Sequence, residues 1–119
     1  MKEDNKILNL TFDFSIQIIG LYKLLVQRNE YVISKQLLRS ATSIGANVEE
    51  ANAAQTKKDF IMKMSIASKE ARESKYWLRL LDKSQMVKAD YSVYLTSVEH
   101  IINILTKIVK TSQESLNSK

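Results

Sequence analysis

The chain has 119 residues, of which 45% are hydrophobic and 26% charged, and 18 basic residues against 13 acidic ones give a formal net charge of +5. This length suits one domain, and the composition argues against a disordered chain. The lack of cysteine excludes disulfides and thiolate metal sites, and the lack of proline leaves a β-rich fold short of turn residues. No run reaches the roughly 18 apolar residues of a membrane span, and the N-terminus does not resemble a signal peptide, so we expect a cytoplasmic protein with no membrane partner.

Apolar residues recur at three- and four-residue spacing in four segments, which predicts amphipathic helices at about 7–28, 31–53, 57–84 and 90–112. Thr56 should cap the third helix, with Asp59 reaching back as in a capping box, and Asp90 should cap the fourth. The tail from Ser112 should fray. Short connections permit only antiparallel neighbours, so the whole chain, residues 1–119, is expected to form one all-α domain, an antiparallel up-and-down four-helix bundle.

The predicted core consists of one apolar stripe from each helix. The stripes are Phe14, Ile18, Leu21 and Leu25; Ile33, Leu37, Ala41, Ile44, Val48 and Ala51; Phe60, Met64, Ala67, Ala71, Ser74, Leu78 and Leu81; and Tyr94, Val98, Ile101, Leu105 and Ile108.

The first and third helices each carry a second apolar set, turned away from the core stripe. These sets are Phe12, Ile19, Tyr22 and Val26, and Met62, Ile66, Tyr76 and Leu80. A monomer would leave part of this surface in water, and a closed homo-oligomer is the commonest way to cover it. We therefore predict that the two sets form an oligomer interface. The alternative is that they wrap the edges of a thick bundle.

A polar stripe follows the second helix beside its core stripe, and two glutamates interrupt the second apolar set of the third helix. We expect a partly buried structural network that fixes helix register, with Arg39 paired to Glu70 or Glu73. The residues assigned to this network are Arg39, Ser43, Asn47, Glu50, Glu70 and Glu73.

The same carboxylates suggest an alternative, an active site or di-metal centre built from Glu50, Glu70 and Glu73. A di-metal bundle needs Glu-x-x-His pairs, whereas the only histidine, His100, directly follows Glu99. A nucleophilic triad needs a histidine base, and His100 has no evident carboxylate and serine partners. No glycine-rich loop that could bind a phosphate precedes a helix. We therefore predict no catalytic residues, no metal and no cofactor, and a protein that is not an enzyme.

Basic residues occupy about a third of the circumference of the third helix. They are Lys58, Lys69, Arg72, Lys75, Arg79 and Lys83. Lys35 and Arg39 would extend this basic stripe if the second helix lies alongside. A lysine and arginine stripe can follow a phosphate backbone and gain affinity by counterion release without reading sequence. The alternative is an ordinary solvated helix face.

Two runs in these helices carry a family resemblance. Residues 36–51 (QLLRSATSIGANVEEA) and residues 66–81 (IASKEARESKYWLRLL) resemble two blocks of the four-helix-bundle proteins encoded within intervening sequences of bacterial 23S ribosomal RNA genes. The resemblance covers about residues 14–84. Asn29 stands where the family often has proline, and Ala51 where it often has glycine, which would alter helix ends but not the fold.

The resemblance implies an antiparallel bundle that assembles into a homopentameric ring. A distant relative, the accessory variability determinant of diversity-generating retroelements, binds nucleic acid and partners a reverse transcriptase. Two hypotheses follow. The protein is either an oligomer that binds RNA or DNA through its basic face, or a scaffold that binds another protein, in which case the basic stripe is incidental.

Overall fold

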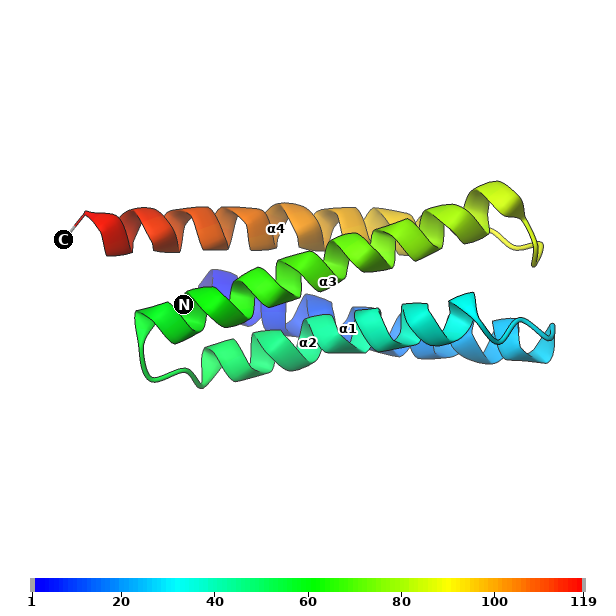
Figure 1. Ribbon diagram of the computed structural model, residues 1–119, viewed down its shortest axis with the longest axis horizontal. Coiled ribbons are helices and arrows are strands. Elements are labelled where there is room, and N and C mark those ends of the chain that lie inside the picture. Colours follow the sequence, from blue (N-terminus) through cyan, green and yellow to red (C-terminus); the bar gives the residue numbers. More distant parts are fainter. Residues whose placement is uncertain (1, 119) are drawn as a thin grey trace.

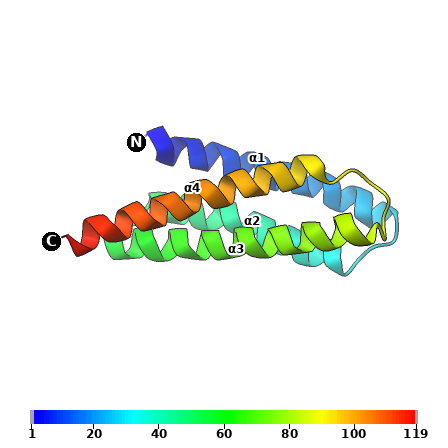
Figure 2. The ribbon, with the colours of Figure 1, turned by 90° about the horizontal axis from the view of Figure 1, so that it is seen from above.

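The computed structural model describes residues 2–118, and the side chains of residues 6–118 (Figure 1). These residues form four helices, α1 (Lys2–Gln27), α2 (Ile33–Asn52), α3 (Lys57–Ser84) and α4 (Ser92–Asn117). Neighbours in the chain run in opposite directions and pack in cyclic order, with α4 closing against α1 (Figures 1 and 2). The beginning of α1 and the end of α4 lie at the same end of a body 52 Å long and 22 Å wide. The predicted all-α fold with four helices is confirmed.

The core forms where the apolar stripes were expected. All predicted stripe residues are buried except Ile33, Phe60 and Tyr94, which lie near helix ends and are half-buried. Tyr91, which the stripes did not include, is fully buried, and its hydroxyl donates to the backbone carbonyl of Val87 at 2.7 Å. This bond ties the loop between α3 and α4 onto the core. Within residues 2–118, no helix combines the length and the hydropathy that a bilayer crossing requires.

Four helix ends differ by two to five residues from the predicted approximate bounds. Helix α1 begins five residues earlier than the predicted residue 7, at Lys2, and α2 and α4 each begin two residues later than predicted. The expected fraying from Ser112 does not occur, because α4 continues to Asn117. The last turns pack beside the start of α3, where Lys57 Nζ donates to Ser115 Oγ at 2.6 Å and Leu116 is half-buried. A polar composition was therefore a poor guide to the end of α4.

The predicted helix caps are present in part. The Thr56 hydroxyl accepts from the Asp59 amide at 3.1 Å, as expected, but among residues 6–118 the Asp59 carboxylate accepts no hydrogen bond from the Thr56 amide. The Asp90 carboxylate accepts from the Ser92 amide at 3.0 Å, although the residue at the N-cap position is Tyr91.

The cap of α2 was not foreseen in the sequence. Glu30 is buried, and its carboxylate accepts from the amides of Val32 at 3.0 Å, Ile33 at 2.9 Å and Ser34 at 2.6 Å. The preceding Asn29 adopts a left-handed conformation with φ of 66°, which turns the chain sharply at the end of α1. A carboxylate at this position satisfies the free amides of the first helical turn and interacts favourably with the helix dipole.

Replacing Glu30 with alanine should destabilise the bundle by about 1–2 kcal/mol, the range measured for lost helix caps. Urea denaturation followed by circular dichroism measures this change. Glu49→Ala is the matched control, because Glu49 is exposed on the same helix. Equal unfolding midpoints for the two variants would contradict the assigned role of Glu30.

Candidate nucleic-acid interface

Two of the six residues of the basic stripe of α3 contact α4. Arg72 Nη2 donates to Thr106 Oγ1 of α4 at 3.0 Å, and Lys75 Nζ pairs with Glu99 Oε1 of α4 at 2.8 Å. The other four predicted residues of the stripe, Lys58, Lys69, Arg79 and Lys83, are exposed. Glu99 offsets the charge of Lys75, so the charge available to an anion lies mainly on the other five side chains.

The two predicted extensions from α2 do not join this stripe. In the cyclic packing order, α2 contacts α3 on the side away from α4, so Lys35 is exposed but separate from the surface between α3 and α4. Arg39 is occupied by two carboxylates of α3. The stripe is extended instead by α4, where Thr106, Lys110 and Gln113 line a groove together with Arg72. The sequence shows that these three α4 residues are four and three positions apart and so share a helix face. It does not show which neighbouring helix that face meets.

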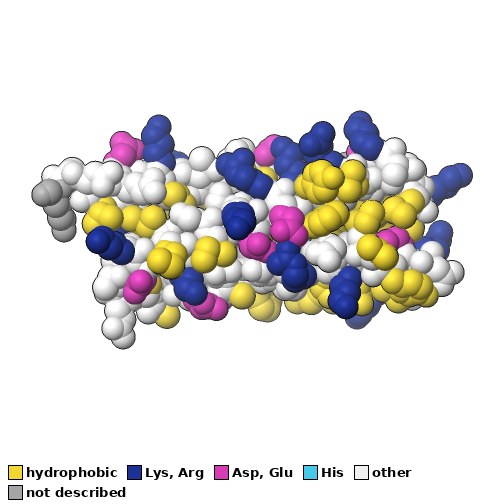
Figure 3. All heavy atoms as spheres, in the orientation of Figure 1, with side chains coloured by type: hydrophobic (Ala, Val, Ile, Leu, Met, Phe, Trp, Pro, Cys, Tyr) yellow, Lys and Arg dark blue, Asp and Glu magenta, His cyan; other side chains and the backbone are white. Residues whose placement is uncertain are grey.

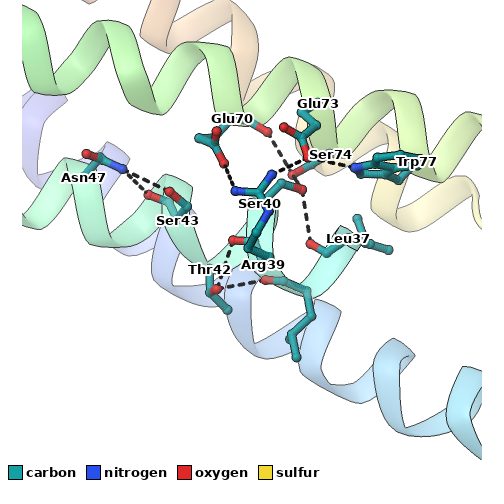
Figure 4. A network of polar contacts seen from close by, with 11 residues as sticks. Leu37, Arg39, Ser40, Thr42, Ser43, Asn47, Glu70, Glu73, Ser74 and Trp77 are labelled. Atoms are coloured by element: carbon teal, nitrogen blue, oxygen red, sulfur yellow. Dashed lines mark hydrogen bonds and ion pairs between the residues drawn. The ribbon is translucent and has the colours of Figure 1, made fainter. Parts of the chain in front are cut away.

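A polar network joins α2 to α3 (Figure 4). Arg39 Nη1 donates to Glu70 Oε2 at 3.0 Å, and its Nη2 donates to Glu73 Oε2, so the guanidinium pairs with both expected glutamates. The indole N–H of Trp77 donates to the same Glu73 oxygen at 2.9 Å. This ion-pair cluster has more hydrogen bonds than the other ion pairs of the described residues, because the guanidinium donates to both carboxylates and the indole also donates to Glu73.

Directly beneath the ion pairs, two buried serines connect the same helices. Ser40 Oγ and Ser74 Oγ lie 2.8 Å apart, and Ser74 Oγ also donates to the Glu70 carbonyl at 3.0 Å (Figure 4). Serines are small enough to let the backbones of α2 and α3 approach closely while satisfying each other's hydrogen bonds. Ser40 was part of the polar stripe, but Ser74 had been assigned to the apolar core.

The other residues assigned to the network do not join it. Asn47 bonds only within α2, to Ser43 (Figure 4), and Glu50 pairs with Lys63 Nζ at 2.7 Å. Glu50 lies 11 residues along α2 from Arg39, a rise of about 16 Å. The three carboxylates considered for a metal centre therefore do not converge. Among the residues that the structure describes, no group of three or more His, Cys, Asp or Glu side chains could hold a metal ion.

The second apolar sets are largely in solvent. Phe12, Met62 and Tyr76 are 61%, 58% and 51% exposed, and Ile19, Ile66 and Leu80 are each a little over one third exposed. Tyr22 and Val26 are half-buried, so the alternative interpretation, in which the sets cover the edges of the bundle core, fits only these two residues. Ile16, also 55% exposed, belongs to the set on α1 but was not predicted. Figure 3 shows hydrophobic side chains gathered on the face that carries α3.

Both apolar sets flank α2. On α1, Phe12 and Ile19 lie three residues before and four after Ser15, whose hydroxyl donates to the Ala41 carbonyl of α2 at 3.4 Å. On α3, Ile66 and Leu80 share a face with Glu73, which contacts Arg39 of α2. The basic stripe and the apolar set of α3 are adjacent on that helix, and Tyr76 lies within one turn of both Arg72 and Arg79.

The network also determines how Glu73 titrates. The hydrogen bond from Trp77 is the main cause that holds the pKa of Glu73 below its usual value, and Arg39 and Lys69 lower it further, while partial burial opposes them. A carboxylate with a lowered pKa stabilises the folded state at neutral pH. That stabilisation is present above the unfolded-state pKa, near 4.5, and is lost as the pH falls through the lower folded-state pKa.

Replacing Trp77 with phenylalanine should reduce stability at pH 7 by about 1 kcal/mol or more, because a hydrogen bond to a charged group is lost. The further loss of stability between pH 6 and pH 3 should be smaller than in the unmodified protein. Urea denaturation followed by circular dichroism measures both effects. Tryptophan fluorescence cannot be used, because the substitution removes the only tryptophan of the sequence. In a Glu73→Gln background, Trp77→Phe should not change the pH dependence of the free energy of unfolding. A change in that background would show that Trp77 acts on a titrating group other than Glu73.

Comparisons with known proteins agree with this fold. The family model described as 23S rRNA-intervening sequence protein matches residues 3–107. A solved crystal structure from Bacteroides thetaiotaomicron VPI-5482, described as a protein with unknown function from the S23 ribosomal protein family, is 43% identical. The alignment has a TM-score of 0.86 and covers 91% of this chain and 98% of that one. No curated protein matches the sequence. Because the family model spans most of the chain, this protein belongs to the 23S rRNA-intervening sequence protein family.

Proposed function

We propose that this is a non-enzymatic, homo-oligomeric protein that binds RNA through phosphate contacts from the basic stripe of α3. One observation carries the proposal: Lys58, Lys69, Arg72, Arg79 and Lys83 are all exposed along one helix. From first to last they span 25 residues, a rise of roughly 38 Å. That length is close to one turn of a B-form DNA duplex, about 34–36 Å, so the stripe is long enough to contact several successive phosphates. Figure 3 shows Lys and Arg side chains along this part of the surface.

The family description supports RNA as the first ligand to test, since it refers to 23S rRNA. Contacts of this kind release counterions and do not read bases, so we expect affinity that falls steeply with salt and depends little on sequence. A basic stripe repeated on each protomer of an oligomer would also raise the avidity for a long strand.

Reversing three charges of the stripe, with Lys69, Arg72 and Arg79 changed to glutamate, should weaken RNA binding at least about a hundredfold at low salt. Fluorescence anisotropy with labelled structured RNA, duplex DNA and a single strand, each at low and near-physiological salt, measures the affinities. Circular dichroism verifies that the bundle still folds.

The matched control for that variant reverses Lys6 and Lys23 of α1 and Arg28 directly after it, three exposed residues outside the stripe. Both variants remove the same formal charge, so a purely global effect of net charge would weaken both equally. Retained binding by the α3 variant, or an equal loss in both, would contradict a binding role for the stripe.

The exposed apolar sets support the oligomeric part of the proposal. The exposed apolar side chains of the two sets lie on the two helices that neighbour α2, and a symmetric self-contact is the commonest way to cover such surface. The homopentameric ring that the resemblance implies is the assembly we propose. A second candidate function rests on the same surface: if a different protein covers it, the chain is a protein-interaction scaffold, and its complex should resist nuclease and high salt.

Changing Ile66 and Leu80 together to lysine should shift the protein toward a 13.7 kDa monomer, because two charges would enter the interface. Sedimentation velocity measures the mass of the assembly. The control changes Met86 and Val93 to lysine, since these residues are also exposed but lie at the loop end of the bundle, outside both sets. A monomeric unmodified protein would refute self-association and favour the scaffold.

A further inference from the structure

A groove of about 300 Å³ lies between α3 and α4, on the side of α3 that carries the basic stripe. Its polar lining comes from both helices: Ser65, Ser68 and Arg72 from α3, and Thr106, Lys110 and Gln113 from α4. The volume is about ten times that of a water molecule in the liquid. It exceeds what a phosphate group needs and leaves room for the adjoining sugar.

The lining offers hydrogen-bond donors and no carboxylate. It contains a guanidinium, an ammonium, a side-chain amide and three hydroxyls. Two other grooves of this bundle differ, because one includes Glu99 beside Lys75 and the other includes Asp13. A donor-rich cleft with two cations suits an anion with several acceptor oxygens, and a phosphate group has that chemistry.

One contact already orients the cation at this groove. Arg72 Nη2 donates to Thr106 Oγ1 at 3.0 Å, which holds the guanidinium against α4. A guanidinium has five N–H donors, so most remain available, and the Thr106 hydroxyl that accepts from Arg72 still has its own proton to donate. Less side-chain freedom is therefore lost when a ligand binds than at a mobile surface arginine.

We infer that this groove binds one phosphate group of a nucleic-acid backbone, an inference that rests on the proposed RNA-binding function. Arg72 and Lys110 neutralise the charge, and the hydroxyls of Ser65, Ser68 and Thr106 donate to the phosphate oxygens. The rest of the basic stripe then guides the flanking strand. This assigns a built site within the stripe, with α4 supplying half of its polar groups.

Variants of the hydroxyl residues distinguish a defined phosphate site from general attraction to a positively charged surface. Replacing Arg72 or Lys110 with glutamine should weaken RNA binding about tenfold and reduce the salt slope by about 0.7–0.9, the value for one phosphate contact. Replacing Ser65 and Ser68 together with alanine should weaken binding several-fold and leave the salt slope unchanged, because a hydroxyl releases no counterion.

The experiment uses anisotropy of a labelled single-stranded RNA at several salt concentrations, with the full chain. Lys23→Gln removes the same charge from an exposed residue of α1, and Thr111→Ala removes a hydroxyl from an exposed residue of α4 that does not line the groove. Both controls should bind as the unmodified protein does. Circular dichroism verifies the fold of each variant.

The outcomes distinguish the two proposals. If the unmodified protein does not bind RNA at any salt concentration, the proposed function fails and this inference fails with it. If it binds and the groove variants behave like their controls, the groove is not the site, while the proposed function stands. If the charge variants lose affinity but the double serine variant does not, the cations act only as part of a diffuse field, and the built site is refuted.

Discussion

The distribution of charge on α3 depends on the pairing of Arg39 with Glu70 and Glu73, which joins α2 to α3 across their buried apolar contact. This pairing places the two central carboxylates of α3 on the edge that faces α2, where a guanidinium and the Trp77 indole neutralise and hold them. On the same helix, Arg72 and Lys75 contact α4, and the exposed Lys69 and Arg79 continue the basic stripe. Opposite charges on one helix are thus separated by the packing of its neighbours. A modestly basic protein acquires a strongly basic surface in this way, since the acids that would screen it are engaged elsewhere.

Small residues make that pairing possible. Ser40 and Ser74 lie at the contact between α2 and α3 with their hydroxyls 2.8 Å apart, and buried Ala41, Ala67 and Ala71 lie nearby. On the other side of α2, a side chain at Gly45 would meet Ser15 Oγ and the Thr11 carbonyl at 3.4 Å, the limit of an ordinary contact. The two runs that resemble the family therefore contain residues that let α2 approach both neighbours closely. Arg39 pairs with its two carboxylates beside this contact of small residues.

The sequence was a good guide where periodicity carries the information. The four helices and their core stripes follow from apolar spacing, and the choice of Glu70 or Glu73 as partners of Arg39 follows from polar residues beside those stripes. It failed where the signal is a three-dimensional arrangement. Glu30 looked like part of a polar loop because nothing local shows that its carboxylate turns back to three amides. The tail from Ser112 was expected to fray because its contact, Lys57 with Ser115, joins positions 58 residues apart and leaves no local signal. The α4 side of the groove was missed for the same reason, and the roles assigned to the surface residues stay predictions.

The placement of the surfaces has a consequence for assembly. Both exposed apolar sets flank α2, on α1 and on α3, whereas the basic groove lies between α3 and α4. In the cyclic order of the bundle, α4 is the helix that does not contact α2. A self-contact built on the apolar sets would therefore cover the α2 side of each protomer and leave the α4 side in solvent. Tyr76 is the point where the two surfaces meet, since it is exposed and lies four residues from Arg72 and three from Arg79. In an assembly that covers the apolar sets, the protomers would meet beside α2, while the groove between α3 and α4, which Tyr76 does not line, would remain open to a phosphate backbone.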